Sequence, residues 1–158
     1  MPHPPAHQAF DLKIFATNWG FTGTIDAFCS QVKKEGYDGI EIWWPMEKSG
    51  QDDLFAALKK HNLDVGFLVG ASQKNAGEHL SHFKRMIDAA AANTVLRPLY
   101  INCHSGRDFF SFEENQAFID HTTALSKQSG ILICHETHRS RMLYAAPVAK
   151  SFIQRNPE

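Results

Sequence analysis

Residues 131–139 read ILICHETHR: an apolar run directly follows Gly130 and ends in a carboxylate, two histidines and an arginine. An apolar run of about five residues between turn signals is typical of a buried strand in a parallel sheet. Its titratable residues then lie at the C-terminal end of the strand, where parallel α/β folds bind their ligands. We therefore expect Glu136, His138 and Arg139 to lie at a binding site.

The rest of the chain repeats a strand followed by a helix. The other expected strands cover residues 12–17, 39–44, 64–69 and 98–103. The expected helices cover about residues 24–35, 52–61, 77–92, 112–129 and 145–154. Successive strands end roughly 26 to 34 residues apart, which is the length of a βα unit. Strict alternation predicts an α/β fold with a parallel sheet and right-handed crossovers.

Two architectures have this alternation, an open doubly wound sheet and a (β/α)8 TIM barrel. No Gly-x-Gly-x-x-Gly motif follows the first strand, which disfavours a dinucleotide-binding sheet. Polar residues end the second, fourth and fifth strands alike. A doubly wound sheet concentrates such residues at one switch point, whereas a barrel collects them from many strands. The pattern therefore favours the barrel.

Composition places limits on the class of protein. A chain of 158 residues fits one domain, and 43% hydrophobic with 21% charged residues is typical of globular proteins. The net charge of −1 gives no basic field for nucleic acid or a membrane surface. We expect residues 1–10 to form a disordered tail and residues 11–158 the folded part. Three widely spaced cysteines, without a Cys-x-x-Cys pair, predict free thiols and a cytoplasmic location.

The two-residue period of a strand predicts which side chains share a face. If Glu136 faces the barrel axis, then Cys134 does too, and His135 faces the helices. If His104 faces inward, then Cys103 faces outward, so a disulfide between Cys103 and Cys134 is disfavoured. The same rule puts further residues on the inward face: Glu41, Trp43, Tyr100, Asn102 and Leu132.

Three motifs, in this order, resemble those of a known family: DGIE (38–41), NCHSGR (102–107) and HETHR (135–139). From Lys13 to Glu158 the chain is similar to the sugar phosphate isomerase/epimerase family. This family lies in the xylose isomerase-like TIM barrel superfamily, with the family-two AP endonucleases. The resemblance implies an eight-stranded barrel that binds a divalent metal. It also implies that Glu136 is a metal ligand and that His104 lies in the site.

The sequence departs from this family because it has strands for only the first five βα units. A complete barrel needs about 250 residues. The later strands of the family supply an aspartate, a histidine and a glutamate to the metal. We therefore expect the barrel to be completed by a C-terminal half in the same gene product or by self-association.

The resemblance implies a metal-dependent sugar or sugar phosphate isomerase or epimerase that transfers a proton next to a metal-polarised carbonyl. A carboxylate with an imidazole suits Mn²⁺, Zn²⁺ or Co²⁺, and Mg²⁺ is a further candidate. The expected catalytic residues are Glu136 and His104. The expected substrate-binding residues are Trp19, Glu41, Trp43, Arg107, His138 and Arg139.

Other interpretations remain open. An AP-endonuclease-like nuclease on the same fold would have a histidine near the end of the third strand, where this chain reads FLVGA (67–71). A non-catalytic fragment is the third possibility. Glu136 has a purely structural interpretation as the partner of Arg139 or Arg107, and Glu41 as the partner of a buried arginine.

Overall fold

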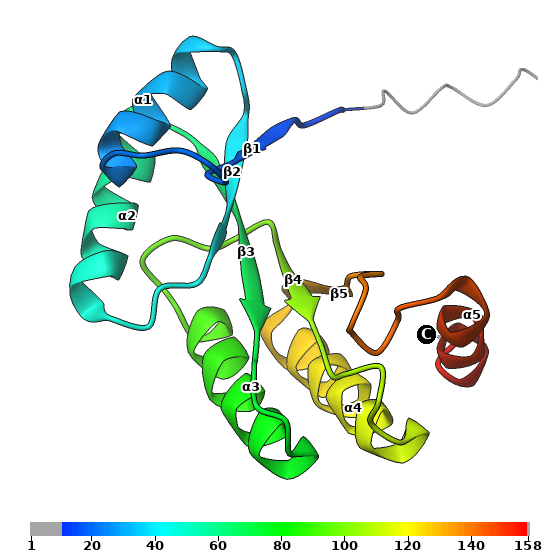
Figure 1. The fold of residues 1–158 in the computed structure, drawn as a ribbon. Helices are drawn as coiled ribbons and strands as arrows, with labels where there is room; N and C mark the ends of the chain where they lie inside the picture. The colour runs from blue at the N-terminus through cyan, green and yellow to red at the C-terminus, as the bar shows by residue number, and fades with distance from the viewer. Residues whose placement is uncertain (1–10, 158) are drawn as a thin grey trace, which may run out of the picture.

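The computed structural model describes residues 11–157, and the tail expected at residues 1–10 lies outside this part (Figure 1). Its strands are β1 (Phe15–Thr17), β2 (Gly39–Trp43), β3 (Asp64–Gly70), β4 (Tyr100–His104) and β5 (Leu132–His135). Its helices are α1 (Ile25–Lys34), α2 (Lys48–His61), α3 (Ala76–Ala91), α4 (Phe112–Ser129) and α5 (Ala146–Arg155). Strands and helices alternate throughout, so the expected α/β class is confirmed.

The five strands form one parallel sheet in the order β1-β2-β3-β4-β5. This sequential order is the one expected for the barrel arrangement, and it puts β1 at an edge, whereas the doubly wound alternative puts it in the middle of the sheet. The strands follow an arc, with α1 to α4 along its outer side (Figure 1). In the described part of the chain, β1 and β5 are the two unpaired edges.

The hydrophobic core lies between the sheet and these helices. Alternate strand residues enter it, among them Ile40, Phe67, Ile101 and Cys103, each 0% exposed. They pack with helix residues such as Phe28, Val32, Phe83, Ile87 and Phe118. The residues between them point to the inner face, and the two-residue prediction is therefore confirmed. Cys103 pairs in register with His135, and Asn102 with Cys134, so the two thiols lie on opposite faces, as expected.

Local signals explain where the elements begin and end. Helix α4 has the expected bounds because Ser111 and Glu114 form a capping box and Gly130 ends the helix in the left-handed conformation. Helix α2 begins at Lys48, one turn before the expected start, directly after the Pro45 turn. Strand β1 is shorter than expected, since the Ile14 N–H donates to the carboxylate of Asp38 (2.7 Å) and not to a neighbouring strand.

Helix α5 packs against α4 at the far end of the arc. The Phe112 and Phe152 rings stack with centroids 4.2 Å apart, and the amides of Gln116 and Asn156 exchange hydrogen bonds.

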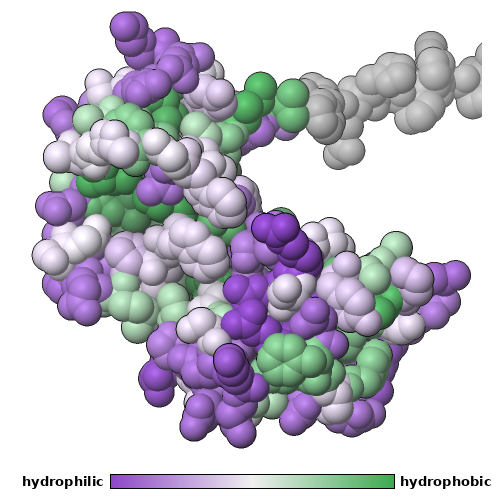
Figure 2. Space-filling model, viewed as in Figure 1, coloured by the Kyte–Doolittle hydropathy of each residue, from purple (hydrophilic) through white to green (hydrophobic). Residues whose placement is uncertain are grey.

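Figure 2 shows hydrophilic residues gathered over β4 and β5, in the middle of the view, and apolar surface around α1 and α2. Within residues 11–157 no helix has the length and apolar character that a membrane crossing requires.

Candidate functional site

The ends of β4 and β5 bring a histidine and a glutamate into direct contact. The Glu136 N–H continues the sheet by donating to the Cys103 carbonyl (3.0 Å). This pairing puts Glu136 beside His104, whose Nε2 lies 2.6 Å from Glu136 Oε2. The amide of Asn102 donates to the same oxygen at 3.1 Å. Glu136 is therefore held by His104 and Asn102, and neither Arg139 nor Arg107 is its partner.

The environment of this pair makes the imidazole a neutral donor. His104 is 4% exposed, and this burial lowers its pKa, although the carboxylate of Glu136 acts in the opposite direction. A neutral His104 keeps its proton on Nε2 and donates it to Glu136. Among residues 11–157, no hydrogen bond reaches the other carboxylate oxygen, Oε1. The Glu136 side chain is 35% exposed, so Oε1 remains accessible to a ligand.

Two further rings lie against His104. The edge of Trp43, at the end of β2, approaches it with centroids 5.0 Å apart, and His138 lies at the same distance. His138 is oriented by a hydrogen bond from Nδ1 to the Arg139 carbonyl (2.6 Å). Trp43 is 37% exposed, which leaves part of its ring free to pack against a ligand.

Glu41 lies on the same inner face, but its partner is a tyrosine. The Tyr100 hydroxyl donates to Glu41 Oε2 (2.8 Å) across the intervening strand. Gly66 is in register with both residues, and a Cβ there would lie 2.4 Å from the Tyr100 ring. The ring therefore reaches Glu41 only because residue 66 is a glycine. Burial raises the pKa of Tyr100, which keeps the hydroxyl protonated as a donor.

The remaining predicted residues are more dispersed. Trp19 is 67% exposed and has no ring contact with the His104–Glu136 pair. Arg139 is exposed, and its side chain makes no hydrogen bond or ion pair within residues 11–157. Arg107 is half-buried and donates from Nη2 to the Ser72 carbonyl (3.0 Å). The structure thus brings Trp43, His138 and Glu136 to His104, but neither Trp19 nor Arg139.

Arg141, which is not among the residues predicted from the sequence, also lies near this site. Its Nη1 donates to the Ala71 carbonyl (2.8 Å), directly after β3. Burial lowers its pKa, and so does the charge of Arg107, whereas the charge of Glu136 raises it. The run RSR at 139–141 was the available signal, but its sequence does not reveal which of the two arginines turns inward.

His135 joins β5 to the layer behind it, as its predicted outward orientation requires. Its Nδ1 lies 2.7 Å from Ser105 Oγ and its Nε2 lies 2.8 Å from Thr122 Oγ1, on α4. Burial lowers the pKa of His135 to about 4. The ring is therefore neutral near pH 7, and it anchors the strand from which Glu136 extends.

A backbone hydrogen bond joins the loops after β4 and β5. Gly106 has a left-handed backbone (φ 57°), and a Cβ there would lie 2.1 Å from Asn115 Oδ1. That oxygen accepts from the Arg107 N–H (3.2 Å), and the Met142 N–H donates to the Ser105 carbonyl (3.1 Å). Arg107 and Arg141 are held on neighbouring loops as a result.

The residues around Glu136 fit a divalent ion only in part. The described residues contain no group of three or more His, Cys, Asp or Glu side chains suited to hold one. Two ligands about 2.1 Å from one ion and at right angles lie about 3 Å apart. His104 Nε2 and Glu136 Oε2 are 2.6 Å apart, so they are hydrogen-bonded and must separate before both can bind an ion.

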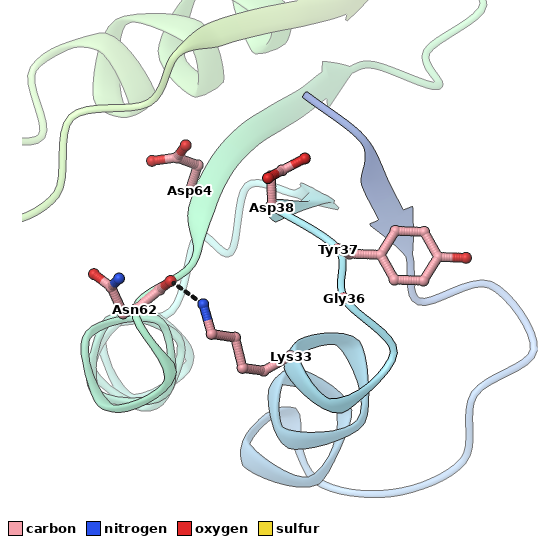
Figure 3. Close-up of a pocket in the computed structure, with 6 residues that line it drawn as sticks. All are labelled: Lys33, Gly36, Tyr37, Asp38, Asn62 and Asp64. Atoms are coloured by element: carbon pink, nitrogen blue, oxygen red, sulfur yellow. Dashed lines mark hydrogen bonds between the residues drawn. The ribbon is translucent and has the colours of Figure 1, made fainter. Parts of the chain in front are cut away.

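A pocket of about 350 Å³ lies away from this pair, at the N-terminal ends of β2 and β3 (Figure 3). Its three charged side chains already have partners. Lys33 Nζ donates to the Asn62 carbonyl (3.3 Å), Asp64 pairs with Lys13 (2.5 Å) and Asp38 accepts from the backbone. Parallel sheets bind ligands at the C-terminal ends of their strands, and this pocket lies at the N-terminal ends, so we interpret it as structural.

Comparison with known proteins finds no family model that matches this chain and no curated protein similar to it.

Proposed function

We propose that this chain is part of a TIM barrel that catalyses isomerisation or epimerisation of a sugar or sugar phosphate, with His104 and Glu136 as the proton-transfer pair. The observation that carries the proposal is the 2.6 Å contact between a buried neutral imidazole and a carboxylate at adjoining strand ends. Such an arrangement is well suited to remove and return a proton beside a carbonyl group.

The neighbouring residues support a sugar as the substrate. Asn102 and His104 both bond Glu136 Oε2, which orients the carboxylate and leaves Oε1 without a hydrogen bond among residues 11–157. The free part of Trp43 offers an apolar face to a sugar ring. Glu41, oriented by Tyr100, offers a carboxylate oxygen to sugar hydroxyls.

A divalent ion belongs to the proposal through the family resemblance, with Glu136 as its ligand from this chain. Such an ion supplies Lewis acidity that polarises a carbonyl. The other protein ligands would have to come from outside the described residues. A cytoplasmic location also belongs to the proposal, because Cys29, Cys103 and Cys134 are all free thiols.

Hydrogen exchange provides the test. Pentoses, hexoses and their phosphates are incubated in D2O with the chain or with a version extended past Glu158. Each incubation is done once with Mn²⁺ and once with a chelator. We expect the sugar to incorporate deuterium at the carbon next to its carbonyl group. The His104→Gln variant should lose this exchange. If neither protein exchanges any of these sugars, the isomerase proposal is wrong.

The partner in the proposal is a further barrel segment. Beside the unpaired edge of β5 lies a largely apolar groove of about 500 Å³ between α4 and α5. Leu132 is 61% exposed and Ile153 67% exposed at this edge. An unpaired strand beside apolar surface is a site for strand addition. We propose that a C-terminal barrel half, or a second copy of the chain, covers it.

We accordingly expect the isolated 158-residue chain to self-associate and to bind a hydrophobic dye, because the β5 edge and its groove are uncovered. Size-exclusion chromatography at several concentrations, together with dye fluorescence, measures both effects. A Leu132→Lys variant places a charge at this edge and should reduce both. A stable, cooperative monomer that binds no dye would contradict the expectation.

A further inference from the structure

Two guanidinium groups lie close together at the ends of β3, β4 and β5. Arg107 donates to the carbonyl of Ser72, and Arg141 to the carbonyl of the preceding residue, Ala71. The two acceptors belong to consecutive residues, and the charge of Arg107 acts on Arg141, so the two groups are neighbours at these strand ends. Both side chains are half-buried, so solvent only partly screens their mutual repulsion.

This pair of charges has no anionic partner within residues 11–157. Each guanidinium has five N–H donors, and each makes one side-chain hydrogen bond, to a neutral carbonyl. Arg107 Nε is enclosed and has no acceptor. Glu136 attracts Arg141 electrostatically, but its Oε2 is occupied by His104 and Asn102. Half-buried cations without a counter-charge are costly unless a ligand compensates them.

A buried histidine, His79, interacts with both arginines and adds no charge of its own. His79 is 0% exposed, and its Nδ1 lies 2.9 Å from the Gln73 carbonyl, so the proton is on Nδ1. Burial lowers its pKa, and Arg107 and Arg141 lower it further. The ring is therefore neutral, and its enclosed Nε2 has no partner in the described part of the chain.

We propose that Arg107 and Arg141 bind the phosphate group of a small phosphorylated substrate. A phosphate monoester carries about −1.5 to −2 charges near pH 7, which matches two guanidinium groups better than a carboxylate does. Guanidinium groups also bind its oxygens through paired hydrogen bonds. The Met142 N–H donates to the Ser105 carbonyl (3.1 Å), and these two residues directly adjoin Arg141 and His104 in the chain, so the phosphate would be bound near the proton-transfer pair.

This inference rests on the proposed function for the reaction, but the binding site is testable without it. The probes are inorganic phosphate, ribose 5-phosphate, ribose and acetate, titrated by calorimetry into the full chain at constant ionic strength in chelator. We expect both phosphates to bind and ribose to show no measurable binding. Arg107→Gln and Arg141→Gln should each weaken phosphate binding about ten- to a hundredfold, as expected for charge-assisted hydrogen bonds.

Two variants separate this site from the others. Arg85→Gln removes one positive charge from an exposed position on α3 and should bind phosphate like the wild type. Glu136→Gln should bind phosphate at least as tightly, because it removes a negative charge near Arg141. Arg107 has an enclosed Nε, so its replacement can affect folding; if Arg107→Gln does not fold, Arg141→Gln and Arg141→Lys decide the result.

Three results would overturn the inference. They are phosphate binding that is equal in Arg141→Gln and Arg85→Gln, acetate binding as tight as phosphate binding, and tighter Arg141-dependent binding of a DNA duplex. The last result would assign the arginines to a nucleic-acid backbone. Phosphate binding that survives in Glu136→Gln, with no sugar exchange in any variant, would retain this site and refute only the isomerase.

Discussion

Replacement of Glu136 with glutamine is expected to reduce sugar hydrogen exchange about 10²- to 10⁴-fold, the usual contribution of a general acid or base. Glutamine has nearly the same shape but cannot accept a proton at this position. We also expect weaker Mn²⁺ or Zn²⁺ binding in the completed barrel, because the proposed ligand has lost its charge. The fold should persist, since Glu136 is 35% exposed and outside the core.

The imidazole of His104 gives a readout that needs no substrate. The carboxylate of Glu136 raises the pKa of His104 against the effect of burial, so Glu136→Gln should lower this pKa further. An NMR titration of the imidazole protons measures the change. Glu113→Gln, at an exposed position in the first turn of α4, is the matched control and should leave His104 unaffected. Unchanged metal affinity and an unchanged His104 pKa would remove Glu136 from the site.

Acidification from pH 7 to pH 4 is expected to lower the free energy of unfolding by roughly 3 kcal/mol through His135 alone. Burial lowers the pKa of His135 to about 4, from an ordinary value of 6.5. Between these values the unfolded chain binds the proton and the folded protein does not. The contribution of His135 to the free energy of unfolding is therefore fully present above about pH 6.5 and is lost as the pH falls toward 4.

Urea unfolding at several pH values tests this contribution. His135→Gln retains a donor and an acceptor for Ser105 and Thr122 but does not titrate. We expect this variant to be less stable at pH 7 and to have a flatter pH dependence. His79 and His104, whose pKa values are also lowered, contribute to the remaining slope. His82→Gln on α3 is the control, and equal slopes for His135→Gln and the wild type would contradict the assignment.

The local signals of the sequence were sufficient for the sheet and its faces. The alternation of apolar and polar residues placed His104 and Glu136 on one face and His135 on the other. Such patterns are predictive because the strand period of two is a property of the backbone itself. The capping residues of α4 likewise determine its bounds, because a cap involves only neighbours in the chain.

Only the tertiary structure decided which polar side chains meet. The Tyr100–Glu41 bond depends on the register of three strands and on the missing side chain of Gly66. Between the two arginines of the last loop, Arg141 turns inward to the Ala71 carbonyl and Arg139 points outward. A loop has no fixed period, so the direction of its side chains is set by contacts with segments about 70 residues away, as at Ala71 and Arg141. The sequence by itself thus determined the α/β pattern and the inward residues of the strands, whereas long-range packing paired Glu136 with His104 and brought Arg107 and Arg141 to consecutive carbonyls after β3.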